Sequence, residues 1–71
     1  MNISQKSMDF LKQRVMPGLG LENITEDDFP EIVDYIADHF EIPLAQAKEA
    51  GEQIDEELLE LAAAVITELT V

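Results

Sequence analysis

Apolar residues recur every three or four positions along this chain, and that spacing constrains the fold more than any other feature of the sequence. Met8, Leu11 and Val15 form one such stripe, and Leu58 and Leu61 begin another. No segment alternates apolar and polar residues with a period of two over the length of a strand. The sequence therefore predicts an all-α fold.

Capping residues and helix breakers divide this pattern into four helices, the third of them short. Pro17-Gly18 predicts the end of the first helix, and Gly51 predicts the end of the third. The second helix begins either at Thr25, as one kinked helix, or, as we favour, at Pro30 after a separate turn. Asp55 is a good N-cap for the last helix. The predicted bounds are residues 4–16, 25 or 30 to 40, 43–50 and 55–69, in a compact four-helix bundle.

The chain is short enough for one helical domain, residues 1–71, to include all of it. It has no cysteine, so the fold must rely on helix packing or self-association rather than on disulfides or thiolate metal sites. Its longest apolar run, residues 61–66, is far shorter than the roughly 20 residues that span a bilayer. Residues 1–16 contain no apolar signal core. We therefore expect a cytoplasmic protein that does not contact membranes.

Charge is distributed unevenly along the chain. The whole sequence has 16 Asp and Glu against 4 Lys and Arg, which gives a formal net charge of -12. Residues 1–16 hold three bases and one acid, whereas residues 17–71 hold one base and 15 acids. Direct binding to nucleic acid needs a basic surface, so this balance argues against it and favours a protein partner of basic character.

The last predicted helix has a wider apolar surface than a small bundle needs. Beside its main stripe, a second stripe formed by Leu59, Ala63 and Ile66 lies about 100° around the helix. Either three partner helices surround this helix, or the second stripe faces another subunit. The second stripe is thus a candidate homodimer interface.

Acidic residues gather at the start and on the outer face of the second predicted helix. The function we favour is a small non-catalytic protein-interaction or regulatory module, in which these acids select the partner at the rim of an interface. The alternative is a nucleic-acid-mimicking inhibitor, in which the carboxylates replace phosphates in the groove of a basic nucleic-acid-binding protein. The candidate residues are Glu26, Asp27, Asp28, Glu31, Asp34 and Asp38.

The sequence does not supply a catalytic constellation. Its single histidine, His39, is expected on the last turn of the second helix, and its only serines, Ser4 and Ser7, belong to another helix. The acidic cluster lacks the alternating ligands and central glycine of a calcium loop, and no Glu-x-x-His pair is present. We therefore predict no enzymatic activity, no cofactor and no metal site.

The apolar spacing of residues 36–47 resembles that of a helix-turn-helix. Ile36-Ala37 is followed, after a short expected turn, by Ile42 and then by another helix. Glu41 occupies the place of the usual turn glycine, and the would-be recognition helix carries one base against two acids, which would repel phosphates. The resemblance implies a similar corner between two helices, with a function other than DNA binding.

Roughly the last fifty residues resemble acyl carrier proteins in length, strong acidity, a short third helix of four, and the run Phe40-Glu41-Ile42-Pro43. That family attaches its phosphopantetheine arm to the serine of an Asp-Ser-Leu motif at the start of its second helix. This chain has Ile24-Thr25-Glu26-Asp27 in that region and no serine after Ser7. The resemblance therefore implies, as a further alternative, an acyl-carrier-like bundle that lacks the modified serine.

Overall fold

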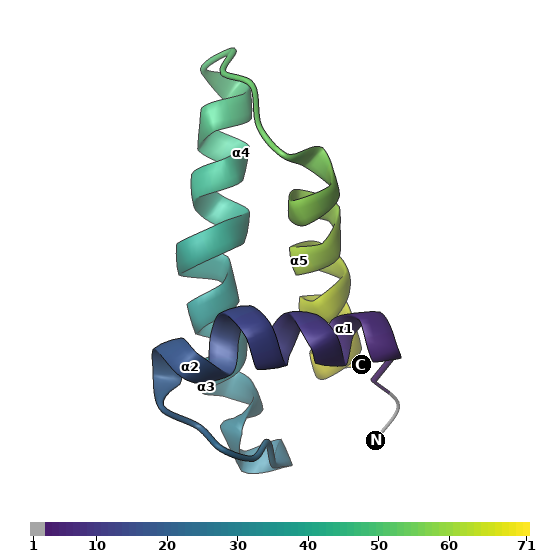
Figure 1. Cartoon of the computed structure of the whole chain (residues 1–71). Helices are drawn as coiled ribbons and strands as arrows, with labels where there is room; N and C mark the ends of the chain where they lie inside the picture. The colour runs from purple at the N-terminus through teal and green to yellow at the C-terminus, as the bar shows by residue number, and fades with distance from the viewer. Residues whose placement is uncertain (1–2) are drawn as a thin grey trace.

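Three helices make up most of residues 3–71, the part of the chain that the computed structural model describes (Figure 1). The first helix consists of α1 (Gln5–Phe10), the π-helical turn η1 (Leu11–Val15) and α2 (Met16–Leu19), which follow one another without a break. The all-α prediction is confirmed, because this part of the chain contains no strand.

The second helix is the longest in the structure. It consists of α3 (Phe29–Ile36), the π-helical turn η3 (Ala37–Glu41) and α4 (Ile42–Glu49), and the 3-10 turn η2 (Glu26–Asp28) precedes it. The third helix, α5 (Glu56–Thr70), follows a loop.

Pro43, which we expected at the start of a separate helix, lies inside the second helix. The Ile42 N–H, just before it, donates to the Ala37 carbonyl five residues back, as in a π-helix. In a regular α-helix the proline ring would collide with the carbonyl four residues back, and the wider π turn relieves this contact. The predicted third helix, residues 43–50, is therefore the end of the second, and residues 3–71 form three helices rather than four.

A similar π turn carries the first helix through Pro17. The Met16 N–H donates to the Leu11 carbonyl, again five residues back. The helix then ends at Gly20, which has a left-handed φ of 70°. The end that we predicted at Met16 was too early, because the π turn accommodates the proline and a glycine further along stops the helix.

The two family resemblances depended on a break that the structure does not contain. Both the helix-turn-helix corner and the short third helix of an acyl-carrier-like bundle need a turn between Ile36 and Ala47, where the chain is helical throughout. Neither arrangement is therefore present in the described residues.

Hydrogen bonds confirm the predicted starts of the helices. Ser4 Oγ accepts the Ser7 N–H at 3.2 Å, and Asp55 Oδ1 accepts the Leu58 N–H at 3.1 Å. Pro30 lies in the first turn of α3, after the separate turn η2, as we favoured.

The hydrophobic core lies where the first helix crosses the other two. The second helix and α5 run antiparallel and pack together through α3 and η3, and α1 crosses them near the C-terminal end of α5 (Figure 1). Beyond this crossing, α4 contains no buried residue. The buried apolar cluster consists of Phe10, Leu11, Val15, Ile32, Ile36, Ala62, Val65 and Leu69.

Gly18 lets the first helix approach the second closely. A Cβ atom at Gly18 would lie 2.1 Å from the Tyr35 hydroxyl oxygen and 2.7 Å from its ring carbon Cζ. The Tyr35 ring also stacks on the His39 ring at a centroid distance of 4.1 Å, which restricts its movement away from an added methyl group.

We expect Gly18→Ala to lower the free energy of unfolding by up to about 2 kcal/mol. Overpacking costs about 1–3 kcal/mol, and the better helix propensity of alanine offsets about 1 kcal/mol of this. The control is the same substitution in a Tyr35→Ala background, where the contact is absent and alanine should stabilise the fold. Urea unfolding followed by circular dichroism measures both, and equal effects in the two backgrounds would contradict the close approach.

Candidate functional site

Five of the candidate acids are exposed along the second helix and the turn before it. Glu26 and Asp27 lie in η2, Glu31 and Asp34 lie in α3, and Asp38 lies in η3. The helical spacing of the last three places them on one side of the helix, away from its buried side. We call these five residues the acidic face.

Asp28, the sixth candidate, has a structural role. It is half-buried, and its Oδ2 accepts the Thr25 backbone N–H at 3.0 Å and the Thr25 hydroxyl at 3.1 Å. This is the reciprocal part of a capping box, so the position of Asp28 has a structural cause.

The acidic face divides into two groups. Glu26, Asp27 and Glu31 lie in first turns, where a carboxylate is stabilised by the positive end of the helix dipole. Asp34 and Asp38 lie beyond the first turn of the second helix, so neither the dipole nor a cap explains them. The positions of these two acids therefore have no structural cause in the described residues.

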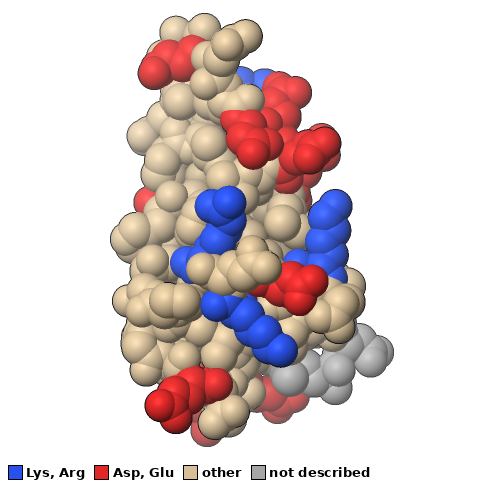
Figure 2. Space-filling view, viewed as in Figure 1, with Lys and Arg blue, Asp and Glu red and all other residues tan. Residues whose placement is uncertain are grey.

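The basic residues of the chain lie mostly on another element. Lys6, Lys12 and Arg14 belong to the first helix, and Figure 2 shows Lys and Arg side chains gathered across it. The only ion pair in the described part of the chain joins Lys48 Nζ to Glu56 Oε1 at 3.1 Å. The acidic face is thus not neutralised by contact with the described bases.

An apolar hollow of about 290 Å³ adjoins the acidic face, between α3 and the end of α5. Asp34 lines this hollow and also belongs to the acidic face. Four of its six lining residues are apolar, and it contains no Lys or Arg. We call it the Phe29 hollow, and its lining residues are Phe29, Pro30, Val33, Asp34, Leu69 and Thr70.

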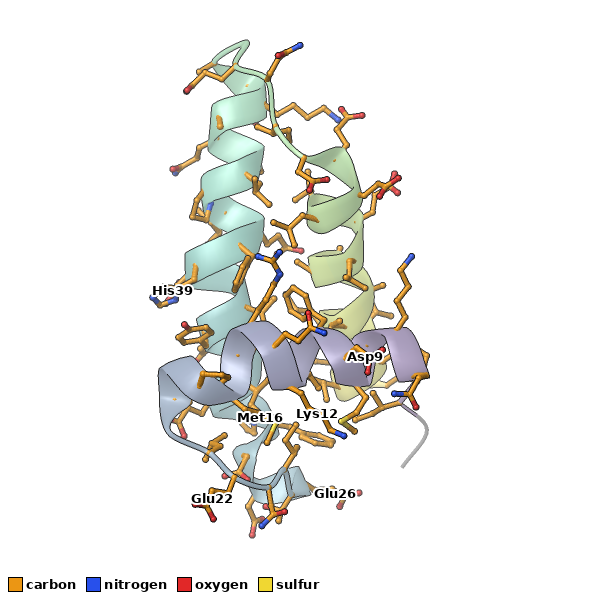
Figure 3. All side chains as sticks on the ribbon, viewed as in Figure 1. Asp9, Lys12, Met16, Glu22, Glu26 and His39 are labelled. Atoms are coloured by element: carbon orange, nitrogen blue, oxygen red, sulfur yellow. The ribbon has the colours of Figure 1, made fainter. Side chains whose placement is uncertain are left out.

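A second hollow, of about 220 Å³, lies between the first helix and the loop that follows it. Met8 and Met16 contribute apolar surface. Lys12 and Glu22 contribute one charge of each sign (both are labelled in Figure 3). We call it the Met16 hollow. Its charges balance, whereas the Phe29 hollow contains a carboxylate and no base.

The predicted dimer stripe on α5 is partly covered within one chain. Leu59, Ala63 and Ile66 are all half-buried, and Ile66 packs against the core. Contacts with α1, α3 and η3 thus explain part of the wide apolar arc of α5. Self-association through the remaining surface of Leu59 and Ala63 stays a prediction.

His39 lies inside the second helix, not at its end as we expected, because the helix continues through η3 into α4 (Figure 3). Its ring stacks on Tyr35 with an interplanar angle of 18°. Its Nδ1–H donates to the Tyr35 carbonyl at 3.0 Å, since a carbonyl oxygen can only accept. This hydrogen bond and the stacking hold the His39 ring against its own helix.

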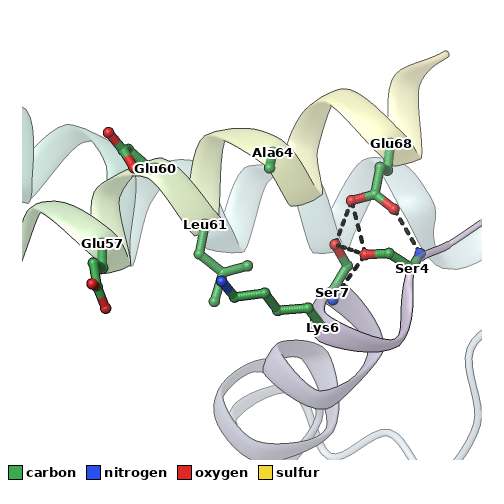
Figure 4. Close-up of a pocket in the computed structure, with 8 residues that line it drawn as sticks. All are labelled: Ser4, Lys6, Ser7, Glu57, Glu60, Leu61, Ala64 and Glu68. Carbon is green, nitrogen blue, oxygen red and sulfur yellow. Dashed lines mark hydrogen bonds between the residues drawn. The ribbon is translucent and has the colours of Figure 1, made fainter.

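A carboxylate near the end of α5 caps the start of α1, which the sequence analysis missed (Figure 4). Glu68 Oε1 accepts the Ser4 backbone N–H at 2.7 Å, and Glu68 Oε2 accepts the hydroxyl of Ser7, which is 1% exposed. The hydrogen bond from Ser7, followed by that from the Ser4 N–H, lowers the pKa of Glu68 below its ordinary value. Ser4 was recognisable as an N-cap, but no local signal links it to a residue so distant in the sequence.

Glu68→Gln is expected to lower the melting temperature at neutral pH, and the difference from wild type should shrink in acid. The folded pKa lies below the unfolded value of about 4.3, so ionised Glu68 stabilises the fold above that pH. This contribution is lost as the pH falls through the lower, folded pKa. Thermal unfolding between neutral pH and strong acid measures the effect.

Glu60→Gln is the matched control, because Glu60 is exposed on the same helix and the substitution removes the same charge. The chain has a net charge of -12, so removing one exposed negative charge reduces repulsion between its acids. This substitution should therefore not lower the melting temperature. A Glu68→Gln deficit that persists unchanged in strong acid would contradict the assigned role of Glu68.

Residues 3–71 contain no helix with the length and apolar character needed to cross a bilayer. Within the same residues, no group of three or more His, Asp or Glu side chains is placed to hold a metal ion. Comparisons with protein-family models, curated proteins and solved structures found no match.

Proposed function

We propose that this chain is a small non-catalytic interaction or regulatory module that binds a basic protein partner through the acidic face. The observation that supports this most directly is the exposure of Asp34 and Asp38, which have no capping role and no ion-pair partner among the described bases. Carboxylates left unpaired on one side of a helix attract a cationic surface and orient its approach.

Reversal of these two charges tests the proposal. An Asp34→Lys/Asp38→Lys variant and the wild type serve as baits for affinity capture from an extract of the source cells. The matched control is Glu49→Lys/Glu52→Lys, which changes the net charge equally at two exposed acids at or just beyond the end of α4. We expect the wild type and the control to retain the same basic partner at low salt, and the double variant to lose it.

High salt should release the partner from the wild type, because exposed charges are screened beyond about 8 Å at physiological ionic strength and more strongly above it. Capture of one partner by all three baits, with no dependence on salt, would contradict the proposal.

A basic nucleic-acid-binding protein is one partner with the required chemistry, which is the mimic hypothesis. In that case the acidic face lies in the partner's phosphate-binding groove, and added duplex DNA should displace this chain. A partner that stays bound in excess duplex DNA binds through another surface and excludes mimicry.

Self-association through α5 is a separate part of the proposal. It is supported by the half-exposed side chains of Leu59 and Ala63, which lie outside the core cluster. Sedimentation at rising protein concentration should show a dimer, and a chain that stays monomeric throughout would overturn this part alone.

A further inference from the structure

We propose that the Phe29 hollow is the anchor site for the basic partner, a refinement that rests on the proposed function. Its occupant is a peptide segment of that partner with one large apolar side chain flanked by Lys or Arg. The apolar side chain enters the hollow, and the flanking bases lie against Asp34 and the rest of the acidic face.

The size and walls of the hollow fit such an anchor. An apolar cavity of about 150 Å³ accepts benzene, so a hollow of about 290 Å³ has room for a leucine or phenylalanine side chain. Phe29, Val33 and Leu69 also pack against the core, so the apolar walls are already formed before a ligand arrives.

The charge around the hollow selects a basic ligand. Asp34 is the only charged residue in the lining, and Glu31 precedes it by one helical turn on α3. The Met16 hollow has a similar apolar character but is lined by both Lys12 and Glu22, so a basic peptide gains less there. Charge complementarity therefore distinguishes the two hollows and favours the one beside the acidic face.

Three capped pentapeptides test the anchor on the full chain. The first has one leucine between two pairs of arginines, the second replaces the leucine by serine, and the third replaces the arginines by glutamates. Amide chemical shifts of the nitrogen-15-labelled chain give both the site and the affinity. We expect the first peptide to shift Phe29, Val33, Asp34, Leu69 and Thr70, and to bind about tenfold tighter than the second. The third should cause no shift.

Two variants separate the hollow from its surroundings. Thr70→Arg places a base in the lining, and we expect it to weaken binding of the first peptide about tenfold. Thr67→Arg is the matched control, because Thr67 lies on the same helix outside the lining and both threonine hydroxyls donate to a backbone carbonyl four residues back. The control should change the affinity less than about twofold.

The results also separate this inference from the proposed function. Equal binding of the first two peptides, with shifts confined to the acidic face, would overturn the anchor and leave the acidic interaction intact. Shifts centred on Met8 and Met16, or no binding of the first peptide at millimolar concentration, would also overturn the anchor. The proposed function fails separately, if partner capture does not depend on Asp34 and Asp38.

Discussion

Replacing Ile36 by alanine should remove about 2–5 kcal/mol of stability, the range seen when a buried isoleucine is truncated to alanine. Ile36 is 0% exposed and belongs to the core cluster where the three helices meet, so the substitution leaves a cavity inside the core. Domains are typically stabilised by about 0.05–0.15 kcal/mol per residue, so this loss is a large share of the total for a chain of 71 residues. The melting temperature should fall by about 8–40 °C.

Ile42→Ala is the matched control for this prediction. Ile42 lies on the same continuous helix but is 45% exposed, so the same chemical change creates little cavity. Its effect should be about 0.5 kcal/mol or less. Urea unfolding followed by the helical circular dichroism signal compares the two, and similar losses for both variants would show that the core is not where the structure places it.

A proline at position 41 should cost about 3 kcal/mol or more, because Glu41 lies inside the second helix. The substitution removes a backbone donor from η3 and brings a ring against the preceding turn of the helix. The sequence pattern alone predicts the opposite result, since it places residue 41 in a turn between two helices where proline is tolerated. The experiment therefore tests the structure directly against the four-helix expectation.

Glu41→Ala separates the backbone effect from the loss of the side chain. Alanine is a strong helix former, so this variant should unfold within about 0.5 kcal/mol of the wild type. Far-ultraviolet circular dichroism should also show less helix for Glu41→Pro than for Glu41→Ala. Equal stability of the two variants would favour a break in the helix near this position.

The helical class and the helix starts were predictable because their causes are local. A cap such as Asp55 bonds to an N–H three residues away, and apolar spacing reports which side of a helix is buried. The ends of helices were harder to predict. Pro17 and Pro43 are strong breakers in isolation, yet each follows a π turn that accommodates it within a continuous helix.

The candidate acids were visible in the sequence, but their separate roles were not. The structure shows that Asp28 belongs to a capping box, whereas Asp34 lies beside an apolar hollow. That hollow has walls from both α3 and α5, and its two α5 residues, Leu69 and Thr70, are far from the other four along the chain. A pattern within one helix cannot reveal a surface that is formed jointly by two helices far apart in the sequence.

The sequence by itself determined that this protein is helical, which faces of its helices are apolar, and that its acids are concentrated after the first helix. These properties follow from local propensity, spacing and composition, which need no partner element. Only the tertiary structure decided that there are three helices, that Glu68 caps the start of α1, and that Asp34 adjoins the Phe29 hollow. The cap and the hollow depend on packing between segments far apart in the chain, and the number of helices depends on π turns that the proline pattern does not reveal.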